Sequence, residues 1–228
     1  MLGILYIIAT PIGNLRDITL RAIEVLKDVD SILCEDTRVT KVLLDHFGIT
    51  KPLLSYHQHS DLEKTAEILK LLAEGKTLAL VSDAGTPGIS DPGNQLVETA
   101  VKEFGGSIKI IPVPGANAAI AALSVSGFAT DKFIFTGFPP AKNKRKKYFQ
   151  DLLANSFTSE YYESNFRILK TLAEIDELNL DKSRQIAVCR ELTKTFETIY
   201  RGTIAEVIEK IKKDPLKGEF AAVLEGKR

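Results

Sequence analysis

Residues 77–93 read Thr-Leu-Ala-Leu-Val-Ser-Asp-Ala-Gly-Thr-Pro-Gly-Ile-Ser-Asp-Pro-Gly. The first six, Thr77–Ser82, form a continuous apolar run of the kind found in buried parallel strands. The next part, Ser82–Gly93, combines three glycines, two prolines and two aspartates. Glycine lets a backbone approach a ligand closely, proline stiffens a loop, and such a loop costs conformational entropy while burying little. We interpret it as a ligand-binding loop, although it contains neither a Walker motif nor a Gly-x-Gly-x-x-Gly fingerprint.

On both sides of this loop, apolar strand-like runs alternate with helical patterns. Strands are expected at residues 3–9, 31–34, 77–82, 108–113, 133–136, 160–162, 185–189 and 220–224, and helices at 20–26, 38–47, 62–73, 94–104, 116–124, 144–154, 166–173 and 203–213. Ser60 and Glu63 are spaced as a capping box for the third helix. This alternation predicts α/β architecture with mostly parallel sheets covered on both faces.

Pro114 and Gly115 form a natural hinge near the middle of the 228 residues. Two layers of similar size fit this length better than one large sheet. We therefore expect two αβα domains with mixed, mostly parallel sheets, an N-terminal one over residues 1–113 and a C-terminal one over residues 114–228.

The composition excludes several classes of protein. Lys plus Arg and Asp plus Glu each number 30, so a polybasic protein is excluded and any nucleic-acid contact needs a local patch. The two cysteines, Cys34 and Cys189, lie too far apart in sequence to suggest a disulfide framework or a zinc site. Residues 1–9 have no basic flank, and residues 110–130 are uncharged but interrupted by proline and glycine. We expect a cytoplasmic protein with reduced thiols and no membrane association.

Two further segments follow predicted strands. Ala9–Leu15 contains Pro11 and Gly13, and Pro112–Ala119 has small residues at the start of a helix. Ligands of open α/β sheets bind beyond the carboxyl ends of strands, and the second segment would suit a flat, uncharged adenosine moiety. Taken without the glycine-rich loop, the first segment is better explained as an ordinary turn, and close helix–sheet packing explains the second segment about as well as a ligand role.

Charged clusters offer other candidates. Five cations lie within six residues and follow a rigid turn, which favours contact with RNA phosphates over a solvated helix face: Lys142, Lys144, Arg145, Lys146 and Lys147. His57 and His59 have no third ligand nearby, so we expect no metal. A second charged set, Arg190, Glu191 and Lys194, fits either a structural ion-pair cluster or a site role.

Together these segments resemble the tetrapyrrole methylase family, the class III S-adenosylmethionine methyltransferases. The resemblance covers nearly the whole chain, and within the family it favours the branch that methylates the ribose 2′-oxygen of a cytidine in 16S ribosomal RNA of the small subunit. The matching segments are Thr10–Leu15, Asp17–Thr19, Arg21–Ala22, Glu35–Arg38, Ser82–Gly93, Val113–Gly115, Gly137–Pro139, Tyr162–Ser164, Arg190–Lys194 and Gly218–Phe220. The resemblance implies two αβα domains with S-adenosyl-L-methionine in the cleft between them, a homodimer and no metal.

Carried over by position, the resemblance implies a set of donor-binding residues: Pro11, Ala84, Gly85, Thr86, Ile89, Asn117, Ala118 and Tyr162. The segment Tyr162–Arg167 departs from the Tyr-Glu-Ser-Pro-His-Arg of relatives, because it has Asn165 and Phe166 in place of proline and histidine.

Methyl transfer to a ribose hydroxyl needs a base, or a cation that stabilises the developing oxyanion. Our hypothesis is that one carboxylate among Asp17, Asp36 and Glu163 orients or deprotonates the hydroxyl, with Arg38 as a candidate cation. The segment Glu35–Arg38 can equally be an N-capped helix entry. Two rival functions remain open at this point, a corrin or porphyrin methyltransferase of the same fold and a non-catalytic RNA-binding assembly factor.

Overall fold

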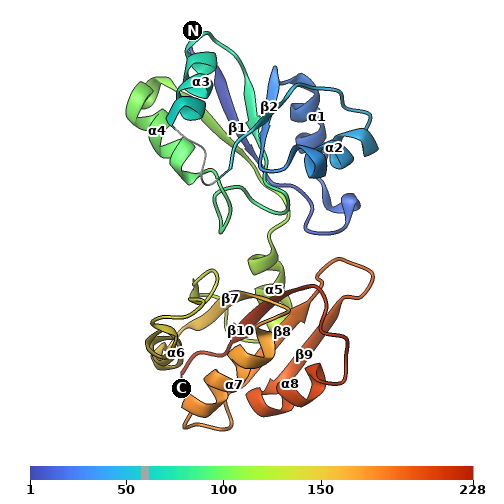
Figure 1. The fold of residues 1–228 in the computed structure, drawn as a ribbon, viewed down its shortest axis with the longest axis vertical. Helices are drawn as coiled ribbons and strands as arrows, with labels where there is room; N and C mark the ends of the chain where they lie inside the picture. The colour runs from blue at the N-terminus through green and yellow to red at the C-terminus, as the bar shows by residue number, and fades with distance from the viewer. Residues whose placement is uncertain (58–61, 228) are drawn as a thin grey trace. The chain divides into compact units, whose positions relative to one another are not determined.

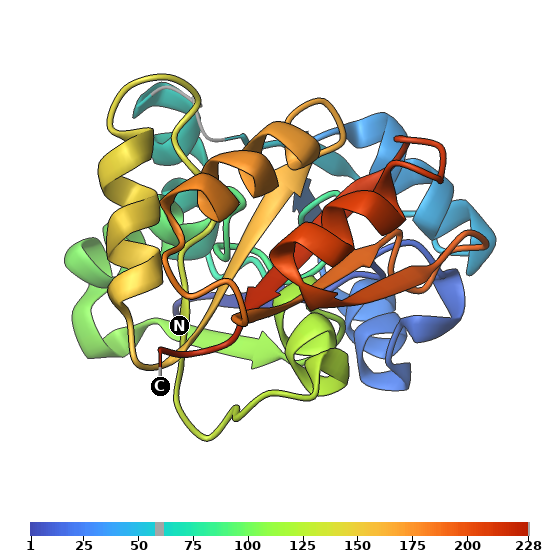
Figure 2. The ribbon, with the colours of Figure 1, turned by 90° about the horizontal axis from the view of Figure 1, so that it is seen from below.

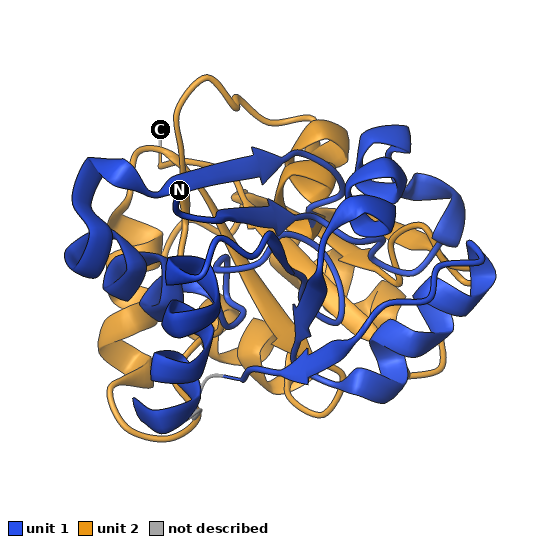
Figure 3. Ribbon diagram, turned by 90° about the horizontal axis from the view of Figure 1, so that it is seen from above, with its two compact units in different colours: residues 1–117 blue, residues 118–228 orange. Residues whose placement is uncertain are grey.

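A computed structural model describes residues 1–57 and 62–227. By its internal contacts the chain divides into two compact units, Met1–Asn117 and Ala118–Arg228 (Figure 3). This division falls a few residues beyond the hinge that the sequence predicts at Pro114 and Gly115. The assignment of residues 1–113 and 114–228 to separate domains stays a prediction, and we describe each unit by itself.

Unit 1 contains a parallel five-stranded sheet in the order β3-β2-β4-β1-β5. The strands are β1 (Ile4–Ile8), β2 (Ser31–Cys34), β3 (Leu53–Ser55), β4 (Leu78–Leu80) and β5 (Lys109–Val113). Every pairing in it is parallel, with Ile7 beside Leu80 and Ile8 beside Val113. The carboxyl ends of all the strands therefore meet at one edge of the sheet.

Helices cover both faces of this sheet (Figure 1). One apolar cluster joins Ala22 and Leu26 of α1 (Leu20–Asp28) and Leu44 of α2 (Thr37–His46) to the sheet. The other joins α3 (Leu62–Ala73) and α4 (Asn94–Phe104) to the opposite face. Short 3-10 turns lie at Leu15–Asp17 and Gly105–Ser107. The capping box expected at Ser60 lies outside the described residues.

Unit 2 contains a second five-stranded sheet in the order β6-β7-β10-β8-β9. Its strands are β6 (Phe133–Phe135), β7 (Thr158–Ser164), β8 (Gln185–Arg190), β9 (Thr198–Thr203) and β10 (Glu219–Leu224). Only the β6–β7 pair is parallel, and the other three pairings are antiparallel. The α/β class with two sheets is confirmed, but the parallel character belongs to the first sheet.

The faces of the second sheet are covered unequally. Helix α5 (Ala118–Ser126) packs on one face through Ala122 and Leu123. Helices α6 (Arg145–Ala154), α7 (Ile168–Leu178) and α8 (Ile204–Ile211) lie side by side over the other face (Figure 2). Thr203 closes a capping box with Glu206 at the start of α8. No helix among the described residues has the length and apolar character needed to cross a membrane.

Candidate functional site at the strand ends

Backbone hydrogen bonds join the loops after β1 and β4 in unit 1. The N–H of Thr10 donates to the carbonyl of Gly85 at 2.8 Å, and the N–H of Gly85 donates back to the carbonyl of Thr10 at 3.1 Å. The Thr10 hydroxyl donates to the carbonyl of Ser82 at 3.1 Å. The glycine-rich loop is therefore fixed against the neighbouring strand end rather than standing free in solvent.

The loop after β5 joins the same structure. The Thr86 hydroxyl donates to the carbonyl of Ala116 at 3.2 Å. Gly115 passes so close to β1 that an added Cβ would lie 3.0 Å from the Cβ of Ala9. Three loops from three neighbouring strands thus form one continuous surface, built largely from backbone groups.

Glycine geometry sets the shape of the long loop. Gly85, Gly88 and Gly93 have φ values of 85°, 82° and 137°, which side chains rarely adopt. An added Cβ on Gly93 would also lie 2.8 Å from the Leu80 side chain. These glycines are required for the loop's path, so the composition that singled it out in the sequence has a structural cause.

The donor-binding residues that the resemblance implies in unit 1 differ in exposure. Ala84 and Ile89 are exposed, and Thr86 is half-buried. Pro11 and Gly85 are buried and shape the loops from beneath. Asn117 ends unit 1, and Ala118 begins α5 of unit 2.

An acidic group lies at the carboxyl end of β2. Asp36 caps α2 by accepting the N–H of Arg38 at 2.8 Å, and its carboxylate also pairs with the Arg38 guanidinium at 2.6 Å. The Asp36 N–H donates to the carboxylate of Asp83 at 3.1 Å, which connects the β2 and β4 loops. The hydrogen bonds from Arg38 lower the pKa of Asp36 to about 2. The capping role expected as an alternative for this segment is thus present.

Glu35 lies beside this group and behaves differently. Burial raises the pKa of its carboxyl, and the negative charge of Asp83 raises it further. His57, which follows β3, acts in the opposite direction. The pKa values of the neighbouring carboxyls Glu35 and Asp36 are therefore shifted in opposite directions. Glu35 is shifted toward the neutral form and Asp36 toward the ionised form.

In unit 2, Tyr162 connects β7 to the first turn of α5. Its hydroxyl accepts the N–H of Ala119 at 3.0 Å, which satisfies a helix-terminal donor. Its ring lies edge-on to Phe135 and Phe138, with centroids 4.9 Å and 5.6 Å away. The aromatic ring of Tyr162 is thus held between the β6–β7 edge of the sheet and the start of α5.

Glu163 is buried and fully hydrogen-bonded. One carboxylate oxygen pairs with Arg167 at 2.7 Å and accepts the N–H of Ser164 at 2.8 Å. The other oxygen accepts the Thr171 hydroxyl at 2.7 Å. These contacts fasten the end of β7 to α7. Asp17, by contrast, is exposed in the 3-10 turn after the β1 loop.

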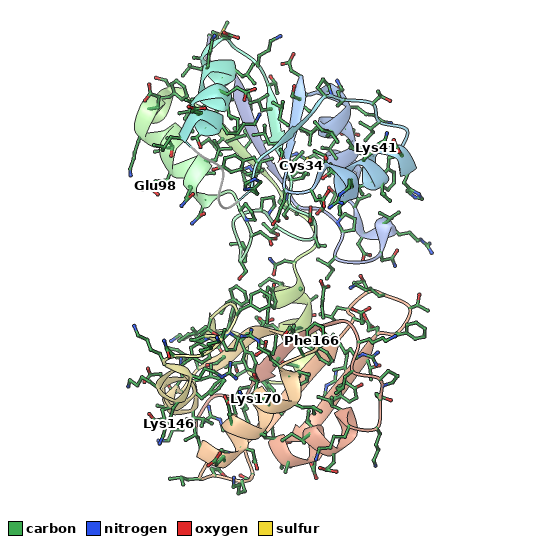
Figure 4. The ribbon with its side chains drawn as sticks, in the orientation of Figure 1. Cys34, Lys41, Glu98, Lys146, Phe166 and Lys170 are labelled. Atoms are coloured by element: carbon green, nitrogen blue, oxygen red, sulfur yellow. The ribbon has the colours of Figure 1, made fainter. Side chains whose placement is uncertain are left out.

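The basic run divides into exposed lysines and one buried arginine. Lys142, Lys144 and Lys146 are exposed, and Lys147 forms a surface ion pair with Asp151 at 2.7 Å (Lys146 is labelled in Figure 4). The guanidinium of Arg145 is buried and binds Glu174, the Thr171 hydroxyl and the carbonyl of Pro140. The sequence pattern alone could not show that this cation is directed into the unit.

The second charged set forms an ion-pair cluster. Lys194 pairs with Glu191 at 2.9 Å and with Glu219 at 3.0 Å. Arg190 is buried and donates to the carbonyl of Lys217 at 2.8 Å. The structural alternative for this set is therefore present. Across residues 1–57 and 62–227, no three His, Cys, Asp or Glu side chains form a group that could hold a metal ion, and His59 lies outside those ranges.

Sequence reasoning did not single out Glu160, which lies in the middle of β7. The side chain is fully buried, and neither carboxyl oxygen has a hydrogen-bond partner among the described residues. Burial raises the pKa of this carboxyl to about 9. The signal in the sequence was an acidic residue inside a strand, Thr158–Tyr161, that is more polar than a buried strand usually is.

Residues 4–208 match the family model described as Tetrapyrrole (Corrin/Porphyrin) Methylases, and the chain therefore belongs to this family. It is a methyltransferase. A protein of Halalkalibacterium halodurans named ribosomal RNA small subunit methyltransferase I is 47% identical over 225 residues, covering 98% of this chain and 76% of that protein. The protein of the same name from Synechocystis sp. is 48% identical, covering 99% of this chain and 80% of its own length.

Solved structures share the fold at much lower identity. The methyltransferase CobJ superposes with a TM-score of 0.70 at 17% identity, covering 99% of this chain and 96% of that one. Diphthine synthase superposes with a TM-score of 0.72 at 13% identity, covering 98% and 90%. The family resemblance drawn from the sequence motifs is confirmed.

Proposed function

We propose that this protein transfers a methyl group from S-adenosyl-L-methionine to the ribose 2′-oxygen of a cytidine in 16S ribosomal RNA of the small subunit. The observation that carries the proposal is the surface of unit 1 in which the β1, β4 and β5 loops are joined by hydrogen bonds. The relatives named for the small ribosomal subunit support RNA as the substrate over a tetrapyrrole.

The strand-end surface suits the donor's chemistry. Bound S-adenosyl-L-methionine supplies a methyl group on a positively charged sulfur. Backbone carbonyls at the strand ends and the exposed carboxylate of Asp83 are groups that attract a cation. Exposed Ala84 and Ile89 offer small apolar contacts for a flat adenosine moiety. The proposed donor-binding set remains Pro11, Ala84, Gly85, Thr86, Ile89, Asn117, Ala118 and Tyr162.

Transfer forms an oxygen–carbon bond, breaks the sulfur–carbon bond and releases the hydroxyl proton, which a base must accept. A base works best when its pKa lies near the operating pH. Asp36 has a pKa of about 2 and is paired with Arg38, so it is better suited to orient than to deprotonate. Glu163 is already bound on both oxygens, which suits a positioning role.

Asp17, which is exposed, stays a candidate base, and Glu35 joins it because its pKa is raised. Arg38 is the candidate cation for the developing oxyanion. Alanine substitution of each carboxylate, assayed by single-turnover methylation, tests this assignment. Full activity in all four variants would end it.

The exposed lysines Lys142, Lys144, Lys146 and Lys147 are proposed to contact RNA phosphates. Phosphate contacts release counterions, so affinity should fall steeply with salt, and the slope should shrink when these lysines become glutamine. Arg145 is left out of this set because it is buried against Glu174. An unchanged slope would contradict the assignment.

The family resemblance further implies a homodimer that acts in the cytoplasm without a metal. Light scattering of the purified chain tests the homodimer, and fractionation of cells tests the cytoplasmic location. Retention of activity after dialysis against a chelator tests whether the protein acts without a metal. A monomer, a membrane-bound fraction or loss of activity would contradict the respective point.

The proposal as a whole is tested by offering labelled donor and three acceptors: small ribosomal subunits, bare 16S ribosomal RNA and a porphyrinogen. Label on the ribose of an RNA nucleotide is the expected result. Label on the porphyrinogen would support a tetrapyrrole methyltransferase instead. Absence of label, together with no binding of the donor by calorimetry, would support a non-catalytic assembly factor.

A further inference from the structure

Phe166 is an exposed aromatic side chain at the turn between β7 and α7 (Figure 4). Its exposed fraction is 91%, and that of Phe138, in the loop after β6, is 55%. A single exposed apolar residue is common on a protein surface. Here two aromatic side chains are exposed in loops at the carboxyl ends of adjacent parallel strands. Because exposure of their rings to water is unfavourable, this arrangement indicates a surface that a ligand covers.

The backbone beneath these side chains is firmly held. The Asn165 amide donates to the carbonyl of Leu216 at 3.2 Å, and the N–H of Arg167 donates to the carbonyl of Ser164 at 3.0 Å. Arg167 also donates to the carbonyl of Pro139 at 3.3 Å, so the residue after Phe166 is joined to the residue after Phe138. Both aromatic side chains thus project from loops that are fixed to each other.

Positive charge borders the two loops. Lys217 is exposed, and its carbonyl is fixed by the buried Arg190 at 2.8 Å. Exposed Lys142 and Lys144 follow the Phe138 loop closely in sequence, and Arg145 fastens that stretch through the carbonyl of Pro140 at 2.7 Å. A ligand for this surface therefore needs flat rings that stack on phenylalanine together with negative charge that pairs with lysine.

Single-stranded nucleic acid meets both requirements, since its bases stack on aromatic rings and its phosphates pair with cations. An apolar patch of a partner protein would cover the rings but would not use the lysines. We propose that Phe166 and Phe138 form a base-stacking platform for unpaired nucleotides of the RNA substrate. This inference rests on the proposed function, and it adds that stacking on these two rings holds the RNA.

The chain contains no tryptophan, which allows a direct optical test. In the Phe166→Trp variant, the indole would be the chain's single tryptophan and would lie on the platform. Titration with a short single-stranded RNA that contains cytidine should quench its fluorescence, because stacked bases quench indole emission. The matched control is Phe157→Trp, at the opposite end of β7, where a 42% exposed phenylalanine also lies near a lysine, with Lys132 Nζ 6.0 Å from the ring. The control should show no quenching.

Affinity for the same RNA separates stacking from simple apolar contact. Base–aromatic stacking is worth about 1–3 kcal/mol per base, so Phe166→Ala should weaken binding roughly 5- to 150-fold. Phe166→Leu keeps an apolar side chain without a ring and should weaken binding almost as much, whereas Phe166→Trp should retain it. Circular dichroism verifies that each variant is folded, which Phe166's exposure leads us to expect.

Two results would overturn the platform: no quenching in Phe166→Trp, or equal affinity in Phe166→Leu and the unaltered chain, the pattern of an apolar contact. Either result, alongside methylation of small subunits by the unaltered chain, would leave the proposed function standing. Conversely, specific quenching without any methyl transfer would support the platform and refute the proposed methylation. The two failures are therefore distinguishable.

Discussion

Glu160 should make the stability of unit 2 depend on pH in an unusual direction. Its carboxyl is fully buried without a hydrogen-bond partner among the described residues, and its pKa rises from 4.5 to about 9. Between these values the unfolded chain has lost this proton while the folded chain keeps it. Stability must therefore fall as pH rises.

The size of the effect follows from proton linkage. Each pH unit in this window costs about 1.4 kcal/mol, so the Glu160 contribution to stability at pH 7 is about 3 kcal/mol below its value at pH 4.5. Glu160→Gln removes the titration, and Glu160→Leu also removes the buried polar atoms. Both variants should gain stability over the unaltered chain as pH increases from 5 to 8.

Urea unfolding followed by far-ultraviolet circular dichroism measures this gain at a series of pH values. Comparing each variant with the unaltered chain cancels the contribution to the pH dependence of stability from groups that titrate identically in both, including Asp36. For Glu160→Gln the expected difference is small at pH 5, and for both variants it grows by about 1 kcal/mol or more for each further pH unit. A difference that stays constant from pH 5 to pH 8 would refute the reasoning, because it would show that Glu160 is ionised in the folded chain.

Three further perturbations follow from the geometry. Gly93→Ala should lower the free energy of unfolding by more than about 1 kcal/mol in urea, because φ is 137° at this residue and the added Cβ would lie 2.8 Å from the Leu80 side chain. Unchanged stability would show that the loop relaxes freely. Arg145→Gln should cost about 3 kcal/mol because it removes the ion pair and the hydrogen bonds of a buried guanidinium, whereas Lys146→Gln should cost less than about 0.5 kcal/mol; equal losses in the same assay would contradict the burial of Arg145. Burial raises the pKa of the Cys189 thiol to about 12, so iodoacetamide should not modify it in the folded chain at pH 8, and rapid modification measured by mass spectrometry would contradict its placement.

The alternation of apolar runs and helical patterns was enough to predict an α/β fold with sheets covered by helices on both faces. Strand β2 and helix α4 have the predicted bounds, because an apolar run in one and glycines after the other mark their ends clearly. Strands β3 and β9 were not predicted. The first has only three residues, and the second, Thr198–Thr203, mixes polar and apolar residues that are held in place by pairing with β8.

Strand β7 shows why local pattern underestimates a central strand. It was predicted as residues 160–162, yet it covers Thr158–Ser164 between β6 and β10. Its polar residues gain order from hydrogen bonds to two neighbours rather than from hydrophobicity. Likewise, Arg145 reads as one of five equivalent cations, and it is distinguished by partners that the local pattern does not reveal, chiefly Glu174 and Thr171 on another helix.

The proposed site was likewise predictable only in part from local sequence. Ser82–Gly93 could be identified from composition, since glycine and proline reflect backbone requirements directly. The hydrogen bonds from Thr10 to Gly85 and from Thr86 to Ala116 join residues distant in sequence, and no local pattern encodes them. The same holds for Glu163, whose partners Arg167 and Thr171 become visible only once β7 and α7 are packed.

The most direct test of the account is calorimetric titration of the full chain with S-adenosyl-L-methionine, compared with the Gly85→Val variant. Gly85 has a φ of 85° and exchanges two backbone hydrogen bonds with Thr10, so a branched side chain there should displace the loop that we assign to the donor. We expect one binding event per chain in the unaltered protein and at least a tenfold weaker one in the variant. Equal binding in the two proteins, or no binding in either, would contradict the assignment of these strand-end loops to the methyl donor.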